Sequence, residues 1–394
     1  MPLPPPSRLA RHWALDPDVV FLNHGSFGAC PRVVLEAQHK LRQTMEAEPV
    51  RFLVRELPDL LDHARRTLAT FVDGDGDGLA FVANATTGVN TALAALPMAA
   101  GDQILVTDHG YPACRNAVEV AAKRAGAEVI EAHLPFPVAT TDTLVDAVLC
   151  SVSRRTRAAV VDHVTSSTGL VLPIATLVTE LERRGVAVII DGAHGPGMTE
   201  LGVTSLGAAF YAGNCHKWLC APKGAGFLWV RDDWRDRTRP LVTSHGWAAP
   251  SHGRNRLHLE FDWTGTNDPT PWLAVPEAIS AIAAMVDGGW SEVRARNHRL
   301  AIEGRRVLCR AFGIESPCPD EMIGSLAAVP LPETGSSAEL PASGIEPLQN
   351  RLFHEHRIEV PVTRWAHPVC RAIRISAQLY NSLDQIRYLA SVLT

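Results

Sequence analysis

The sequence lacks any long apolar run. No stretch of its 394 residues approaches the length of a membrane span, and the opening MPLPPPSRLARHW has no continuous apolar segment of the kind found in secretory signals. It also lacks an excess of basic charge, because 37 basic and 42 acidic side chains give a net charge of -5. We therefore expect a cytoplasmic protein that binds neither a membrane nor nucleic acid.

Cysteine pairs and metal-binding motifs are missing as well. The eight cysteines are scattered without a C-x-x-C pair, so we expect reduced thiols rather than a disulfide framework. None of the 16 histidines lies in an H-E-x-x-H pattern. The run DGDGDG at 73–78 resembles the start of a calcium loop but lacks the ligand at the twelfth position. The sequence thus predicts no metal site.

Strand-like and helix-like segments alternate between Leu79 and Asp191. The strand-like segments read LAFVAN, QILVTD, AVVDHV and VAVIID, and the helix-like segments between them read TTGVNTALAAL, ACRNAVEVAAKRAG and PIATLVTELERRG. This alternation predicts βαβ units and a mostly parallel sheet covered on both faces. GAGFLWV at 224–230 reads as a further strand, the one antiparallel member of the sheet.

The remaining segments predict an α/β fold of two domains preceded by an arm. Residues 1–20 are rich in proline and form the arm. Residues 21–275 form the large domain. Residues 276–394 form a smaller α+β domain, entered through a helical segment that breaks at 287–289. Strands are expected at 358–365 and 370–376, and an irregular loop at 330–347.

Polar residues gather where the predicted parallel strands end. The segments concerned are 83–87, 108–111, 163–167 and 191–194. Ligands of such sheets bind beyond the carboxyl ends of the strands, so these four segments predict a single site.

The stretch from Val186 to Leu228 supplies the most specific chemistry. An apolar strand ends at Asp191, and Asn214, His216 and Lys217 lie close together further on. A buried carboxylate and an amine are what pyridoxal phosphate requires, one for its ring nitrogen and one for a Schiff base. Taken singly, Asp191 with Gly192 also fits an ordinary turn, and Lys217 an ordinary solvated lysine.

Four motifs resemble one known family. FLNHGSFGACP, DGAH, GNCHKWLCAPKGAGFL and TGTNDPTPWLA follow one another between about Asn23 and Tyr380. They resemble the class V aminotransferase family of pyridoxal phosphate enzymes, of fold type I, and in particular its isopenicillin N epimerase-like members. The resemblance implies the fold and the cofactor. It leaves the reaction open, because this family includes epimerases, transaminases, desulfurases and carbon–sulfur lyases.

The resemblance also implies a role for each site residue. Lys217 carries the cofactor and then removes the α-proton, while Asp191 holds the ring nitrogen. Thr266 reaches the phosphate of the partner subunit, which implies a homodimer with shared active sites. The remaining cofactor contacts are Asn84, Ala85, Thr86, Tyr111, His163, His194, Asn214 and His216, and the expected substrate contacts are Asn23, His24, Gly25 and Arg374.

Several of these residues also have structural alternatives. Asn84 and Thr86 fit a plain helix cap, Tyr111 fits packing against Pro112, and each histidine at a strand end fits a structural role.

The fate of the α-carbanion divides the possible reactions. Epimerisation needs a second acid, for which His24 and His109 are candidates, whereas β-elimination or decarboxylation of an S-conjugated cysteine, such as a sulfoxide or a lincosamide-type conjugate, needs none. Transamination is also open. Desulfurase chemistry is disfavoured, because residues 363–368 contain no cysteine. A binding module without cofactor is disfavoured by the joint presence of Asp191, Lys217, His216 and Arg374.

Overall fold

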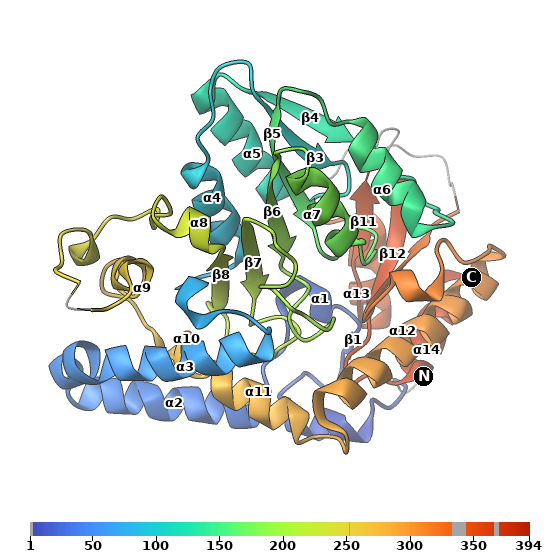
Figure 1. The fold of residues 1–394 in the computed structure, drawn as a ribbon. Coiled ribbons are helices and arrows are strands. Elements are labelled where there is room, and N and C mark those ends of the chain that lie inside the picture. Colours follow the sequence, from blue (N-terminus) through green and yellow to red (C-terminus); the bar gives the residue numbers. More distant parts are fainter. Residues whose placement is uncertain (1–2, 252, 333–343, 366–369) are drawn as a thin grey trace.

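A seven-stranded sheet forms the centre of the large domain. The computed structural model describes residues 3–251, 253–332, 344–365 and 370–394 (Figure 1). The strands follow the order β2-β8-β7-β6-β5-β3-β4 across the sheet. They are β2 (Leu79–Val82), β3 (Gln103–Thr107), β4 (Glu128–Ala132), β5 (Thr156–Asp162), β6 (Ala187–Gly192), β7 (Phe210–Asn214) and β8 (Gly226–Val230).

The sheet is mostly parallel. Strand β8 is antiparallel to both of its neighbours, β2 and β7, and the other pairs are parallel. Both the parallel sheet and its antiparallel member are therefore confirmed. The pairing aligns Asp162 of β5 with Asp191 of β6, so two carboxylates leave the sheet at the same edge.

Helices cover both faces of this sheet. Along β2, Ala80 and Val82 pack with α4 (Ala85–Ala95) and α5 (Pro112–Ala125), while Leu79 and Phe81 belong to the core on the other face. That second core includes residues of α6 (Thr141–Cys150) and α7 (Ile174–Glu182) (Figure 1). Alternate residues of a strand point to opposite faces, so an apolar run such as LAFV suits a strand covered on both sides.

The N-terminal region contacts the small domain before the chain enters the large one. The backbone N–H of Ser7 donates to the carbonyl of Tyr380, and β1 (Val20–Phe21) pairs in parallel with β10 (Ile358–Glu359). The N-terminal region is mostly helical; the helical run is interrupted at Glu48, directly before Pro49, whereas Pro58 lies in the first turn of a helix, where proline is tolerated. Its elements are η1 (Arg8–His12), α1 (His24–Phe27), α2 (Arg32–Ala47), a π-helical turn η2 (Arg51–Glu56), α3 (Leu57–Phe71) and η3 (Gly76–Gly78).

Short helices lead from the sheet to the small domain. They are α8 (Asp232–Arg235), η4 (His245–Trp247), α9 (Arg256–Phe261), α10 (Thr270–Leu273) and α11 (Val275–Ala283), and α12 (Gly289–Phe312) follows. The predicted break before α12 is present, because Gly288 and Gly289 adopt φ of 97° and 59°, a region that side chains disfavour. The boundary that we propose at 275/276 falls at the start of α11.

A second sheet, of three antiparallel strands, organises the small domain. Strand β12 (Cys370–Ser376) lies between β11 (Val362–Trp365) and β9 (Leu326–Pro330). Helix α12 packs beside α14 (Leu383–Leu393), and η5 (Asp320–Met322) and α13 (Pro347–His356) complete the domain (Figure 1). Much of the irregular loop expected at 330–347, and part of the cysteine-free stretch at 363–368, lies outside the described residues.

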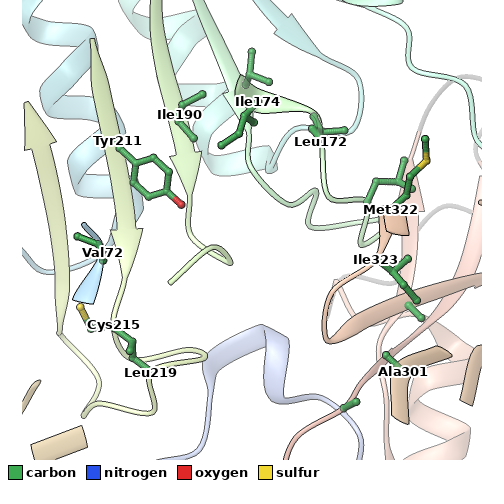
Figure 2. Packing of buried hydrophobic residues seen from close by; sticks show 14 of the residues in the cluster. Val72, Leu172, Ile174, Ile190, Tyr211, Cys215, Leu219, Ala301, Met322 and Ile323 are labelled. Carbon is green, nitrogen blue, oxygen red and sulfur yellow. The ribbon is translucent and has the colours of Figure 1, made fainter. Parts of the chain in front are cut away.

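One buried core joins the two domains. It runs from Ile190 and Tyr211 on the large sheet to Met322 and Ile323 on the other side (Figure 2). Among the residues that the structure describes, no helix is both long and apolar enough to cross a membrane.

Candidate active site

A cavity of about 320 Å³ lies where β5, β6 and β7 end. All four segments that the sequence singled out contribute residues to the cavity wall. Segment 108–111 contributes only Tyr111. Nine of the predicted cofactor contacts line this cavity: Asn84, Ala85, Thr86, Tyr111, Asp191, His194, Asn214, His216 and Lys217.

Lys217 is a partly buried amine on the turn after β7. Its Nζ lies 3.1 Å from Nε2 of His194. Burial lowers the pKa of Lys217 to about 8; Arg374 adds to this effect and Asp191 opposes it. Lys217 therefore has a larger neutral fraction near neutral pH than an ordinary lysine, as a Schiff-base lysine needs.

Asp191 is held from two sides. Its Oδ1 accepts the backbone N–H of Ala193 at 3.0 Å, and its Oδ2 accepts the thiol of Cys114 at 3.0 Å. Burial and the nearby Asp191 carboxylate raise the pKa of the Cys114 thiol, so this group remains a protonated donor. The arrangement fixes a buried carboxylate in one orientation, as a partner of a pyridinium nitrogen requires.

Asp162 is a second buried carboxylate in the cavity wall, which the sequence analysis missed. It accepts the backbone N–H of Tyr111, and burial together with Asp191 raises its pKa well above the usual range. Its position at the end of a strand, directly before the predicted His163, is the signal that could have identified it.

The start of α4 is closely capped. The Asn84 side chain accepts the Thr87 N–H at 2.9 Å, and Asn214 Oδ1 accepts the Ala85 N–H at 2.8 Å. The cap expected as the structural alternative for Asn84 is thus present. Thr86 lines the cavity at this helix N-terminus, where the helix dipole favours an anion.

Two of the predicted histidine contacts, His163 and His216, occupy different positions. The ring of His163 is buried, with Nδ1 2.9 Å from the Tyr211 hydroxyl, and does not line the cavity. His216 Nδ1 donates to the Ala225 carbonyl at 3.0 Å, and burial lowers the pKa of this ring to about 4. A neutral His216 then offers only an acceptor at Nε2, so it must gain a proton to donate to a phosphate.

Asn23, His24 and Gly25, which were expected to form one wall of the substrate site, do not line the cavity. Ser26 and Phe27 line the cavity instead, and Phe27 is 74% exposed. The His24 ring turns behind the lysine, with Nδ1 2.8 Å from the Tyr380 hydroxyl and Nε2 3.0 Å from the Lys217 carbonyl. At Gly28 the chain passes so close to His216 that a Cβ would lie 2.1 Å from its carbonyl oxygen, so this segment packs directly against the lysine turn.

Neither residue considered as a second acid lines the cavity. His24 is bound behind Lys217, and His109 is fully buried with Nδ1 2.9 Å from the Thr168 hydroxyl. Burial lowers the pKa of both rings, which keeps them neutral.

Arg374 lies at one end of the cavity, behind two of its lining serines. Its guanidinium donates to the Ser166 carbonyl and lies 3.3 Å from the Ser26 hydroxyl. In the described part of the chain it makes no ion pair with a carboxylate, and its Nε is buried without a partner. A buried guanidinium in this state suits an incoming carboxylate.

Thr266 lies apart from these residues. It is exposed on the loop after α9 and does not line the cavity of its own chain. In the described ranges, no group of three or more His, Cys, Asp or Glu side chains is arranged to hold a metal ion.

The residues present fit pyridoxal phosphate. The cavity brings together an amine with a depressed pKa, a buried carboxylate held by two donors, and the N-terminus of a helix. These are the groups that the aldehyde, the ring nitrogen and the phosphate of that cofactor require.

Comparisons with known proteins agree with this geometry. The isopenicillin N epimerase of Streptomyces clavuligerus is 35% identical over 96% of this chain and 95% of its own length, and that of Amycolatopsis lactamdurans is 37% identical over 96% of each. A probable chloroplastic L-cysteine desulfhydrase of Arabidopsis thaliana is 31% identical over 93% of this chain and 80% of its own.

Solved structures share the fold at lower identity. The cystine C–S lyase C-DES, in complex with cysteine persulfide, gives a TM-score of 0.77 at 22% identity over 95% of this chain and 97% of its own. The Escherichia coli cysteine desulfurase CsdA gives 0.77 at 20% identity over 98% and 96%. The family model described as aminotransferase class-V matches residues 19–341. The chain therefore belongs to the class V aminotransferase family of pyridoxal phosphate enzymes.

Proposed function

We propose that this chain binds pyridoxal phosphate on Lys217 and removes the α-proton of an amino-acid-type substrate. The observation that supports this most directly is the meeting of the Lys217 amine and the Asp191 carboxylate in one cavity, with Arg374 at its end. When bound, the cofactor supplies an electron-withdrawing ring that stabilises the carbanion left by proton loss.

Three residues have separate roles in this reaction: one binds the substrate, one moves a proton and one holds the ring nitrogen. Arg374 receives the substrate carboxylate and so fixes the direction of the α-hydrogen. Lys217, once its amine is free, takes that hydrogen as a general base. Asp191 keeps a proton on the ring nitrogen by ion pairing.

Isopenicillin N epimerase-type chemistry is the principal candidate. Relatives with that name match this chain at 35% and 37% identity over nearly their full length. In this reaction Lys217 takes the proton from one face, and a proton returns to the opposite face.

Carbon–sulfur lysis is the second candidate. Relatives described as L-cysteine desulfhydrases match at 31% and 32% identity. Elimination needs one base only, and neither His24 nor His109 reaches the cavity to act as a second acid. Decarboxylation of an S-conjugated cysteine, and transamination, use the same groups and are decided by the same experiment.

The deciding experiment is product analysis in deuterated water. The protein is incubated with L-cysteine, with cysteine sulfoxides and conjugates, and with peptides that carry a free amino acid end. An epimerase yields the inverted substrate with deuterium at the α-carbon, and a lyase yields pyruvate, ammonia and the sulfur fragment. Absence of α-deuterium and of product with every substrate would contradict the proposal.

Attachment at Lys217 has its own test. Borohydride reduction of the cofactor-loaded protein is expected to fix the cofactor on Lys217 and not on Lys223, whose Nζ donates to the Gly28 carbonyl at 2.8 Å. Lys223→Ala is the matched control, because it removes an amine from the same region and leaves the proposed attachment site. Label on Lys223 in the unaltered protein would reject the assignment.

A homodimer with shared sites belongs to the same proposal. Thr266 is exposed and outside its own cavity, as a contact to a partner's phosphate requires. An apolar groove of about 430 Å³ lies close by, lined by Leu53, Val54, Leu57 and Trp263, and Val54 is 66% exposed. We also propose a cytoplasmic location, which suits a chain whose eight cysteines include no C-x-x-C pair.

A further inference from the structure

The protonation state of Lys217 is linked to a neighbouring pair of rings, Trp218 and His194. The indole Nε1–H of Trp218 donates to Nδ1 of His194 at 3.2 Å, and both side chains are buried. An indole N–H donates and never accepts. The Nδ1 of His194 therefore bears no hydrogen.

This fixes the tautomer of His194. A neutral imidazole carries one ring hydrogen, and with Nδ1 excluded that hydrogen is on Nε2. A doubly protonated ring is excluded by the same contact, since it would set two N–H groups against each other. Burial, with the charge of Lys217 next, also places the pKa of His194 well below 6.5.

The Nε2–H of His194 faces the Lys217 amine at 3.1 Å. A charged ammonium has only donors, so it would confront this N–H. A neutral amine has a lone pair that accepts it. Of the possible proton arrangements, only a neutral amine with hydrogen on Nε2 satisfies both contacts of His194.

We propose that His194 is a positioning residue that holds Lys217 as a neutral, nucleophilic amine, and that Trp218 enforces this by fixing the His194 tautomer. The inference rests on the proposed function in that Lys217 is the amine that takes up the cofactor. It concerns the protein before uptake, and it adds a task for Trp218, a residue that was not among the predicted site residues.

Other charged groups act on the same amine. Asp191 and Asp162 favour its charged form, as does the Cys114 thiol, while Arg374 opposes it. Around His194 the further groups are Arg374, His24 and His216. The hydrogen bond from His194 therefore acts in the same direction as burial and Arg374, and against the carboxylates.

The test measures the pKa of Lys217 without using activity. The full-length, cofactor-free protein is labelled with trace acetic anhydride over a series of pH values, and acetylation of each lysine is measured by mass spectrometry. The chain has only four lysines, and Lys40 and Lys123 are exposed internal references. The labelling midpoint of Lys217 gives the pKa of its amine.

Four variants separate the contributions. Trp218→Phe keeps an aromatic ring but removes the N–H that fixes the tautomer of His194. His194→Glu replaces the N–H donor that faces Lys217 by carboxylate acceptors. Both variants are expected to raise the labelling midpoint of Lys217. His194→Gln keeps one acceptor and one donor and should leave it unchanged. Tyr211→Phe is the matched control, because it removes the polar hydrogen of a buried ring that contacts a different histidine, His163.

For Trp218→Phe we expect an increase of about one pH unit, which corresponds to roughly tenfold slower labelling at pH 7. A midpoint that does not differ between Trp218→Phe and Tyr211→Phe would overturn the inference. If Trp218→Phe does not fold, equal midpoints for His194→Glu and His194→Gln would overturn it equally. Borohydride fixation of the cofactor tests the proposed function separately, since the midpoint is measured without cofactor.

Discussion

Asp162 and Asp191 lie opposite each other on neighbouring parallel strands, and both carboxylates are buried in the wall of one cavity. They differ in their partners. Asp191 accepts two hydrogen bonds that hold it for a cationic ring, whereas the pKa of Asp162 is raised well above 3.8 by burial and by Asp191. Burial beside a second carboxylate therefore favours the protonated form of Asp162.

This difference predicts a stabilising substitution. Because the folded-state pKa of Asp162 lies above its unfolded value, the folded state binds more protons in the pH range between them, and stability falls as pH rises through that range. Asp162→Asn removes the ionisable group while keeping an acceptor for the Tyr111 N–H. It should raise the free energy of unfolding at neutral pH, by about 1.4 kcal/mol for each unit of pKa shift removed, and not at pH 3. Urea unfolding at both pH values checks this; an equal effect at both would contradict it.

Replacing Asp191 should affect chemistry far more than folding. Asp191→Asn preserves the shape and the acceptor for the Ala193 N–H, but an amide does not hold a pyridinium charge. We expect α-proton exchange to slow by roughly 10²–10³-fold, with cofactor binding largely retained. Exchange followed by NMR in deuterated water gives the rate, and an unchanged rate would exclude the proposed role.

Arg374→Lys tests carboxylate recognition. A point charge replaces a planar fork, so KM should rise while kcat changes less. Arg371→Lys is the matched control, because Arg371 lies on the same strand but pairs with Glu346. Equal KM values for the two variants would remove Arg374 from the substrate site.

Cofactor uptake should depend on pH through Lys217. The neutral amine is the reactive form, and burial lowers its pKa to about 8. The rate of uptake at a fixed cofactor concentration, followed by absorbance, should therefore rise with pH and level off above about 8. A rate that continues to rise to pH 10 would indicate an ordinary, solvated lysine.

A mixed dimer tests the role of Thr266. Lys217→Ala and Thr266→Ala proteins are combined under conditions of subunit exchange, so that one site of each mixed dimer carries both defects and the other carries neither. Activity should exceed that of either parent, up to about half of wild type per mixed dimer. No gain despite proven exchange would place Thr266 within its own site or outside both.

The fold and the cavity floor follow from local sequence patterns. The parallel sheet, the antiparallel β8 and the break at Gly288 were predictable, because each depends on strand periodicity or on a backbone conformation that favours glycine. The strand-end residues Asp191 and Tyr111 line the cavity as expected, since a parallel sheet brings such ends together.

The residues that sequence reasoning misplaced depend on contacts between distant segments. The direction of His24 is set by Lys217 and Tyr380, neither of which is near it in the chain. The hydrogen bond from Cys114 to Asp191 joins the first turn of α5 to strand β6. No periodicity encodes such contacts, so Ser26 and Phe27 were missed although they lie within the recognised motif FLNHGSFGACP.

The link from Tyr380 through His24 to the Lys217 carbonyl has a consequence for synthesis. The lysine turn contacts His24, which is itself held by Tyr380, a residue far beyond Lys217 in the chain. A growing polypeptide on the ribosome therefore carries its lysine long before the support for it exists. The support for the lysine turn is complete only after Tyr380 has left the ribosome, so this turn reaches its final form late in synthesis.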